Sequence, residues 1–218
     1  MLSGAAARLR HLAARARIVR FRARVRFVAL AAHATVDLQI HPSVVLEDIP
    51  EIYVREGTHN RLVIGPRAVI GSLVRIELRG GELLMGEGAD IRRLCRLNTQ
   101  GTCRLGAEVL LSTGVHVHCS EHIAFDDWAI VGEFSTIADS NHLRTGVDQH
   151  VYHSSESAPI HIGRNVWIGA KVTIAKGVTI GDQCFIGANS VVTRDVEAWW
   201  LAAGIPAAPI KRLEQHDS

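Results

Sequence analysis

The sequence has few aromatic residues, few cysteines and no long apolar run. Aromatic side chains make up 5% of the 218 residues, so aliphatic residues and glycine must supply most of the core. The 4 cysteines contain no C-x-x-C pair, which is typical of reduced thiols in a cytoplasm. No apolar stretch reaches the ~18 residues that a membrane-spanning helix requires. We therefore expect a single cytoplasmic domain with no membrane span.

Acidic residues are absent from the first 36 positions, which contain eight arginines. The rest of the chain has 16 basic and 22 acidic residues, so the folded body is acidic. Because nucleic-acid-binding proteins are usually basic across their folded surface, we do not expect a nucleic-acid partner. Residues 8–26 have two open interpretations: peripheral contact with the inner face of an anionic membrane, or packing on the body or on a neighbouring subunit.

Two secondary structures are also open for this basic segment. Apolar residues of 5–19 follow helical spacing, whereas residues 20–27 alternate between arginine and apolar side chains as a strand would.

Residues 162–197 repeat in steps of six. Position one of each hexad is aliphatic: Ile162, Ile168, Ile174, Ile180, Ile186 and Val192. Position two is small or turn-prone: Gly163, Gly169, Ala175, Gly181, Gly187 and Thr193. A helix repeats near 3.6 residues and a strand near 2, so the register matches neither alone. Each hexad is expected to form a short strand and a turn, with position one inside and position two small where the backbone bends.

The repeat continues less regularly toward the N terminus. It shifts register at Leu105 and again at Cys119, where extra residues should bulge from a corner. A polar insertion at 143–158 interrupts it, and long loops often carry function. We expect a basic segment at 1–35, a coil at 36–197 that contains this insertion, and a segment at 198–218 that caps the open end.

Several motifs between residues 119 and 213 resemble the hexapeptide-repeat acyltransferases, specifically their sugar O-acetyltransferase branch of maltose, galactoside and capsule or colanic-acid enzymes. The motifs are Asp139-Ser140-Asn141-His142, the insertion, Pro-Ile-x-Ile-Gly-x-Asn-Val-Trp-Ile-Gly-Ala at 159–170, and Ala-Gly-x-Pro at 203–206. The resemblance implies an all-β, left-handed parallel β-helix and a homotrimer with active sites shared between neighbours. It also implies acetyl transfer from acetyl-CoA to a hydroxyl of a sugar or glycan, without a metal.

The resemblance further assigns roles to individual residues. His142 would be the general base, while Asp139 would either orient its imidazole or cap a turn. Matched positions for acetyl-CoA are Ala170, Ala188 and Thr193, with Lys211 or Arg212 near its phosphates. Ser112 and Trp167 would border the acceptor. Two positions depart from the family: Ser112 replaces an asparagine and Ala208 an arginine, so the acceptor's identity stays open.

Three other functions compete with this one. An antibiotic or other small-molecule acetyltransferase would differ mainly in its acceptor pocket. A non-catalytic β-helix scaffold would keep the hexads but tends to lose the histidine and the insertion. A γ-type carbonic anhydrase would bind zinc through three histidines, and the sequence offers His116, His118, His122, His142, His150, His153 and His161.

Overall fold

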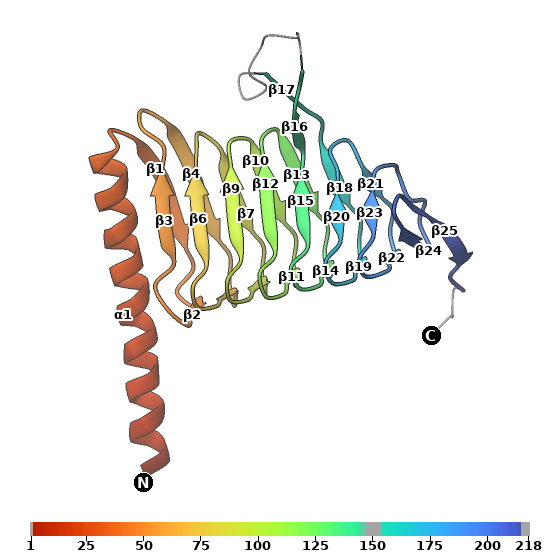
Figure 1. The fold of residues 1–218 in the computed structure, drawn as a ribbon. Helices are drawn as coiled ribbons and strands as arrows, with labels where there is room; N and C mark the ends of the chain where they lie inside the picture. Colours follow the sequence, from red (N-terminus) through yellow and green to blue (C-terminus); the bar gives the residue numbers. More distant parts are fainter. Residues whose placement is uncertain (1, 145, 147–153, 215–218) are drawn as a thin grey trace.

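The chain folds into a parallel β-helix. The computed structural model describes residues 2–144, 146 and 154–214 (Figure 1). Its strands stack into three parallel sheets that form the three faces of a prism, with helix α1 (Leu2–Ala31) across the N-terminal end. The predicted β-helix of hexapeptide repeats is confirmed.

Each coil contributes one strand to each sheet, and the described residues form the following strands. Sheet A contains β1 (Thr35–Ile40), β4 (His59–Ile64), β7 (Glu82–Met85), β10 (Thr102–Leu105), β13 (His122–Phe125), β18 (Ile160–Ile162) and β21 (Thr179–Ile180). Sheet B contains β2 (Val45–Leu46), β5 (Val69–Ile70), β8 (Asp90–Ile91), β11 (Leu110–Leu111), β14 (Ile130–Val131), β19 (Trp167–Ile168), β22 (Phe185–Ile186), β24 (Trp200–Gly204) and β25 (Ala207–Arg212). Sheet C contains β3 (Glu51–Val54), β6 (Arg75–Leu78), β9 (Arg96–Thr99), β12 (His116–Cys119), β15 (Thr136–Ala138), β20 (Thr173–Ile174) and β23 (Val191–Val192).

The predicted position-one residues line the core of the last coils. All six are buried, with exposed fractions of 0–2%. We expected position two to be small because the backbone bends there, and this reason is wrong: the backbone does not enter the left-handed region at position two. It does so at position four, as at Asn165, Lys171 and Gln183. Position two is small because coils approach closely: a Cβ on Gly169 would lie 2.6 Å from the Ala188 nitrogen.

The coils shorten from the N terminus to the C terminus. Register partners are 24 residues apart at Thr35 and His59, 20 apart at Glu82 and Thr102, and 18 apart at the last coils. Leu105 and Cys119, where we expected the register to shift at a corner, are instead buried in strands β10 and β12, which pair with their neighbours without a bulge. The insertion does not disturb this stacking, because β13 pairs directly with β18.

Helix α1 covers the first coil. The strand alternative for residues 20–27 is wrong, because buried side chains recur at helical spacing in Ile18, Phe21, Val25 and Ala29 and pack the helix onto β1, β2 and β3. Arg22 donates a hydrogen bond of 2.6 Å to the Ile40 carbonyl, and Arg17 donates one of 3.1 Å to the Leu46 carbonyl. The basic segment therefore also satisfies backbone groups of the first coil.

The C-terminal end is closed by a β-hairpin. Strand β24 pairs in parallel with β22, so the coil continues beyond residue 197, the end expected from the hexads. Strand β25 then pairs with β24 in the antiparallel direction. Residues 198–214 thus include the hairpin that follows the last coil, and β25 is the exposed edge strand of sheet B; residues 215–218 lie outside the described residues.

Candidate active site

His142 lies at the end of a short arm that projects from the prism. Strands β16 (Ser140–His142) and β17 (Ser155–Ser157) form an antiparallel pair in which His142 is opposite Ser155. Figure 1 shows this arm leaving the prism between β15 of sheet C and β18 of sheet A. Strand β16 precedes the predicted insertion at 143–158, and β17 lies within it. The arm places an exposed imidazole at the corner between sheets A and C.

His142 lines a pocket of about 700 Å³ that lies over sheet C. The pocket floor comes from outward-facing positions of β9, β12 and β15, where Asn98, His118 and Ala138 are register partners. Tyr53 and Arg79 line it toward the N-terminal end. The hexad pattern did not identify these other residues of the pocket, because the coils that carry them repeat every 20 residues and not every 18. The available signal was the alternation of polar residues in Arg96–Thr99 and His116–Cys119.

The two histidines of β12 are held in the neutral form. Burial, followed by the charges of Arg96 and His118, lowers the pKa of His116. Burial is also the main cause that lowers the pKa of His118. Because burial lowers the pKa of both side chains, the neutral form of each ring is favoured, and a neutral imidazole can accept a hydrogen bond.

Asp139 is buried immediately before the arm. Its carboxylate accepts hydrogen bonds from the backbone nitrogens of Ser120 at 2.6 Å, Glu121 at 2.8 Å and His122 at 2.9 Å. These contacts fix the turn between β12 and β13 directly beneath the start of the arm. They are the contacts of a turn cap, which was one of the two roles expected for this residue.

A second cavity, of about 390 Å³, gathers four of the predicted residues. Ser112, Trp167, Ala170 and Ala188 all line it on sheet B and at its corner with sheet C. Trp167 is half-exposed and packs edge-to-face on Phe185, with 5.3 Å between the ring centroids. Ala170 and Ala188, two of the three positions predicted to contact acetyl-CoA along the coil, therefore share one groove with Ser112 and Trp167, which we call the sheet B groove.

The predicted phosphate-binding residues lie next to this groove. Lys211 and Arg212 line a neighbouring cavity of about 450 Å³, together with Gln183 and Trp199. Phe185 lines both cavities, so the two are adjacent. Thr193 lines neither of them; it follows β23 at the corner between sheets C and A.

Within one chain the structure does not bring His142 to the sheet B groove. His142 lies at the corner between sheets C and A, whereas Ala170 and Ala188 lie at the corner between sheets B and C. The two sites share no lining residue. The predicted base and the predicted cofactor residues thus flank opposite edges of sheet C.

The cysteines are all buried and free. Burial raises the pKa of Cys95 to about 11 and that of Cys119 to about 12, and it also raises the pKa of Cys184. Since the thiolate is the nucleophile, these thiols are unreactive at neutral pH.

The histidines do not form a metal site among the described residues. No group of three or more His, Cys, Asp or Glu side chains is arranged to hold a metal ion there. His161 instead pairs with Asp126 at 2.9 Å. His150 and His153, considered for zinc, lie outside the described residues. Within the described residues, no helix combines the length and the hydropathy needed to cross a bilayer.

Comparison with known proteins supports this architecture. Residues 159–194 match the family model described as bacterial transferase hexapeptide (six repeats). The galactoside O-acetyltransferase of Escherichia coli is 51% identical over 61 residues, which cover 28% of this chain and 30% of that protein. A Mycobacterium tuberculosis protein named "Probable acetyltransferase" is 30% identical over 110 residues, covering 50% of this chain and 35% of that protein. The chain thus spans about a third of the length of these curated relatives.

Solved structures share the fold. A hexapeptide-repeat-containing acetyltransferase of Vibrio cholerae, complexed with acetyl-coenzyme A, superposes with a TM-score of 0.52 at 23% identity and covers 70% of this chain and 71% of its own. A polySia-specific acetyltransferase superposes with a TM-score of 0.54 at 19% identity, covering 85% of this chain and 83% of its own. The expected resemblance is confirmed: residues 159–194 are hexapeptide repeats of the bacterial transferase type, on a fold shared with hexapeptide-repeat acetyltransferases.

Proposed function

We propose that this protein is an acetyl-CoA-dependent O-acetyltransferase that acetylates a hydroxyl of a sugar or glycan. The observation that carries the proposal is the exposed His142 imidazole, which the arm presents over a polar pocket of about 700 Å³. The 51% identity to a galactoside O-acetyltransferase supports a sugar acceptor. Histidine suits a general base because its ordinary pKa lies near neutrality.

The reaction needs one proton acceptor and no acyl-enzyme. His142 takes the proton from the acceptor hydroxyl as the hydroxyl oxygen attacks the thioester carbonyl carbon. The tetrahedral intermediate then collapses, the carbon–sulfur bond breaks, and the imidazolium returns its proton to the departing CoA thiolate. The products are an acetyl ester and free CoA. Backbone N–H groups of the coil would stabilise the oxyanion, as such donors do in other acyl transfers. The buried, protonated cysteines take no part.

Acetyl-CoA would lie along the sheet B groove. Ala170 and Ala188 are small, which lets a pantetheine chain approach the backbone. At the adjacent cavity, Lys211 and Arg212 would meet the anionic phosphates. The complex of the Vibrio cholerae protein with acetyl-coenzyme A is in line with this co-substrate. Thr193 lies away from both cavities, so a contact from this residue would have to reach a ligand bound to another subunit.

A homotrimer would complete the site. His142 and the sheet B groove flank opposite edges of sheet C, so one chain does not unite base and co-substrate. A neighbouring copy that sets its groove beside the arm would do so. This is the arrangement that the family resemblance implies, and the closed symmetry of a trimer would build three equivalent sites.

The experiment that tests the proposal is release of thiol from acetyl-CoA in the presence of simple glycosides and polysaccharide fragments. We expect thiol release to require a sugar, with an acetyl ester formed in equal amount by mass spectrometry. Chloramphenicol serves as the comparison acceptor for an antibiotic acetyltransferase. Thiol release with chloramphenicol but with no sugar would replace our proposal by that alternative, and absence of release with every acceptor would refute it.

Helix α1 is proposed to touch an anionic membrane surface, where a lipid-linked glycan would be the acceptor. Its outward face exposes Arg15, Arg20, Arg24 and Phe27, whose exposed fraction is 72%. Arginines that point away from the body are available to lipid phosphates, with about 1 kcal/mol expected for each residue near the surface.

We expect the protein to sediment with vesicles that contain phosphatidylserine, and binding should weaken as salt is raised. The double variant Arg20→Glu/Arg24→Glu should abolish this sedimentation. The control variant Arg104→Glu changes an exposed arginine of β10, far from α1 in sequence, and should bind as the wild type does. Equal binding to neutral and anionic vesicles would contradict the electrostatic contact.

A further inference from the structure

The pocket beneath His142 is lined by cationic and hydrogen-bonding groups. Its cationic lining residues are Arg55 and Arg79, and its hydrogen-bonding ones include His116, His118 and His142 together with serine, asparagine and glutamine side chains. None of its lining residues in the described part of the chain is an aspartate or a glutamate. A pocket of this composition attracts a negatively charged ligand.

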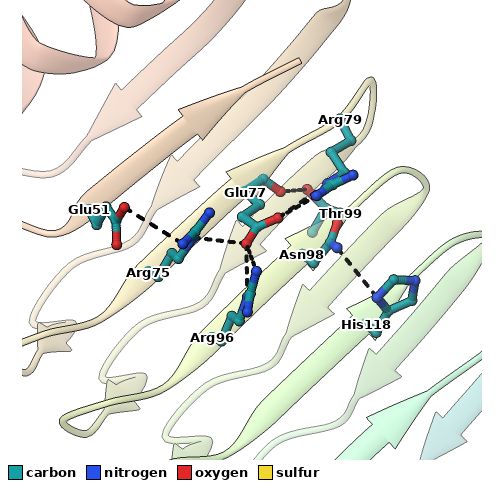
Figure 2. A network of polar contacts seen from close by, with 8 residues as sticks. All are labelled: Glu51, Arg75, Glu77, Arg79, Arg96, Asn98, Thr99 and His118. Atoms are coloured by element: carbon teal, nitrogen blue, oxygen red, sulfur yellow. Dashed lines mark hydrogen bonds and ion pairs between the residues drawn. The ribbon is translucent and has the colours of Figure 1, made fainter.

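A buried carboxylate organises three arginines, one of which, Arg79, lines the pocket. Glu77 is fully buried and contacts three guanidinium groups: Arg79 at 2.8 Å, Arg75 at 2.8 Å, and Arg96 (Figure 2). Burial by itself would raise the pKa of Glu77, but hydrogen bonds from Arg79 and Arg96 outweigh it and lower the pKa. Glu77 is therefore ionised. With Glu51, which lies 3.7 Å from Arg75, it supplies two negative charges against three arginines, so one positive charge is left unbalanced.

Arg79 is fixed in position but still accessible. Glu77 binds both its Nε, at 3.2 Å, and its Nη2, at 2.8 Å. Its guanidinium carbon also lies 5.4 Å from the centre of the Tyr53 ring. The side chain remains 34% exposed, so part of the guanidinium group faces the pocket. A preorganised arginine loses little conformational entropy when it binds an anion.

Two buried polar atoms of residues that line this pocket lack a partner among the described residues. Asn98 is 6% exposed and its Nδ2 lies 3.3 Å from His118 Nδ1, but its Oδ1 accepts no hydrogen bond within that set. Nε2 of His116 is likewise buried and unpartnered there. Buried polar atoms are nearly always hydrogen-bonded, so unpaired ones on a pocket wall point to a ligand that supplies the partner. A sugar hydroxyl is a suitable donor for Asn98 Oδ1.

We propose that the acceptor is an acidic sugar, whose anionic group binds Arg79 and Arg55 while one hydroxyl donates to Asn98 and another faces His142. The inference rests on the proposed function and specifies its substrate class. The anionic group can be a carboxylate, as in a uronic acid, or a phosphate ester. Both accept hydrogen bonds from a guanidinium group, and arginine matches the geometry of each.

The test compares three acceptors that differ in charge: methyl glucoside, methyl glucuronide and glucose 1-phosphate. We expect kcat/KM to be at least ~10-fold higher for one or both anionic sugars than for methyl glucoside. Preference for the glucuronide would identify a carboxylate site, and preference for the phosphate a phosphate site. Equal kcat/KM for all three acceptors would overturn the proposal.

Two substitutions isolate the anion contact. Arg79→Gln should raise KM for the preferred anionic sugar ~10- to 100-fold, with a much smaller effect on methyl glucoside and on KM for acetyl-CoA. Arg55→Gln leaves the Glu77 network intact and should act in the same direction, which covers the case that Arg79→Gln disturbs folding. Arg104→Gln on sheet A is the matched control. Unchanged KM for the anionic sugar in both pocket variants would exclude these arginines.

A binding measurement separates this proposal from the proposed function. The His142→Ala variant should bind the anionic sugar as tightly as the wild type in saturation-transfer NMR, and Arg79→Gln should lose the signal. Binding without any acetyl transfer by the wild type would refute the acetyltransferase activity while preserving the anion site. Transfer to neutral sugars, without binding of either anionic sugar, would refute the anion site alone.

Discussion

Replacing His142 with alanine should lower the turnover of acetyl transfer by ~10²- to 10⁴-fold, the usual contribution of a general base. The side chain is exposed on the arm, so its removal leaves no cavity in the core and should not change the thermal midpoint. The measurement is initial rate of thiol release at saturating acetyl-CoA, with circular dichroism as a check on folding. Turnover equal to that of the wild type would remove His142 from the mechanism.

A matched control is His161→Ala. His161 is also partly exposed, but it pairs with Asp126 on sheet A and does not line the pocket. Its loss should leave the rate of thiol release unchanged. If the control were as inactive as His142→Ala, the effect would not be specific to the arm.

The His142→Ala variant also tests whether each active site is built from two subunits, because His142 and the sheet B groove lie apart within one chain. Ala170→Trp should fill the groove and be inactive on its own. Co-expressed with His142→Ala, it should restore activity at about a quarter of the sites of randomly mixed trimers. Absence of recovery in mixed oligomers would show that both halves of the site belong to one chain.

Asp139→Ala should destabilise the protein by about 3 kcal/mol, because three backbone N–H groups lose their acceptor. For a domain of this size, the thermal midpoint should fall by about 10 °C. Asp139→Asn should also destabilise it, since an amide presents a donor where the carboxylate has an oxygen. Asp126→Ala, at a half-exposed aspartate, is the matched control and should shift the midpoint little.

The kinetics of Asp139→Asn distinguish positioning from direct assistance to His142. If Asp139 acts through the turn at residues 120–122, turnover should fall while the pH dependence of kcat keeps its midpoint. If it interacts directly with the imidazole, the midpoint should shift to lower pH, because a nearby carboxylate favours the protonated ring. The three backbone contacts favour the first result.

The sequence predicted the core well because the physical constraint is periodic. Ile162 to Val192 occupy equivalent positions of successive hexads, and an aliphatic residue is needed at each. The reason for Gly169 and its equivalents was not visible in the same pattern, because it depends on the distance to the next coil. The strand alternative for residues 20–27 was wrong because the alternation of arginine with apolar residues is typical of a strand. The residues that are buried, such as Phe21 and Val25, are instead four apart, as in a helix.

The candidate site was predicted only in part. His142 and the groove residues Ala170 and Ala188 could be identified, because they lie in or beside the regular hexads that the family shares. The same reasoning could not identify Asn98, Arg79 and His118. They lie near the arm because their coils repeat every 20 or 21 residues, and this register cannot be derived from the hexads. The sequence also did not show that His142 and the sheet B groove lie at opposite edges of sheet C, because this depends on the order of the strands in the three sheets.

The two ends of the prism affect how copies of this chain can associate. A coil with open ends could lengthen by adding another molecule on top of the last strand, as in a growing filament. Here α1 lies across the first coil, and β25 turns back antiparallel along the last. The parallel stacking of coils is therefore interrupted at both ends, which favours contact between copies side by side. Lateral contact is also what would set the arm of one molecule against the groove of another.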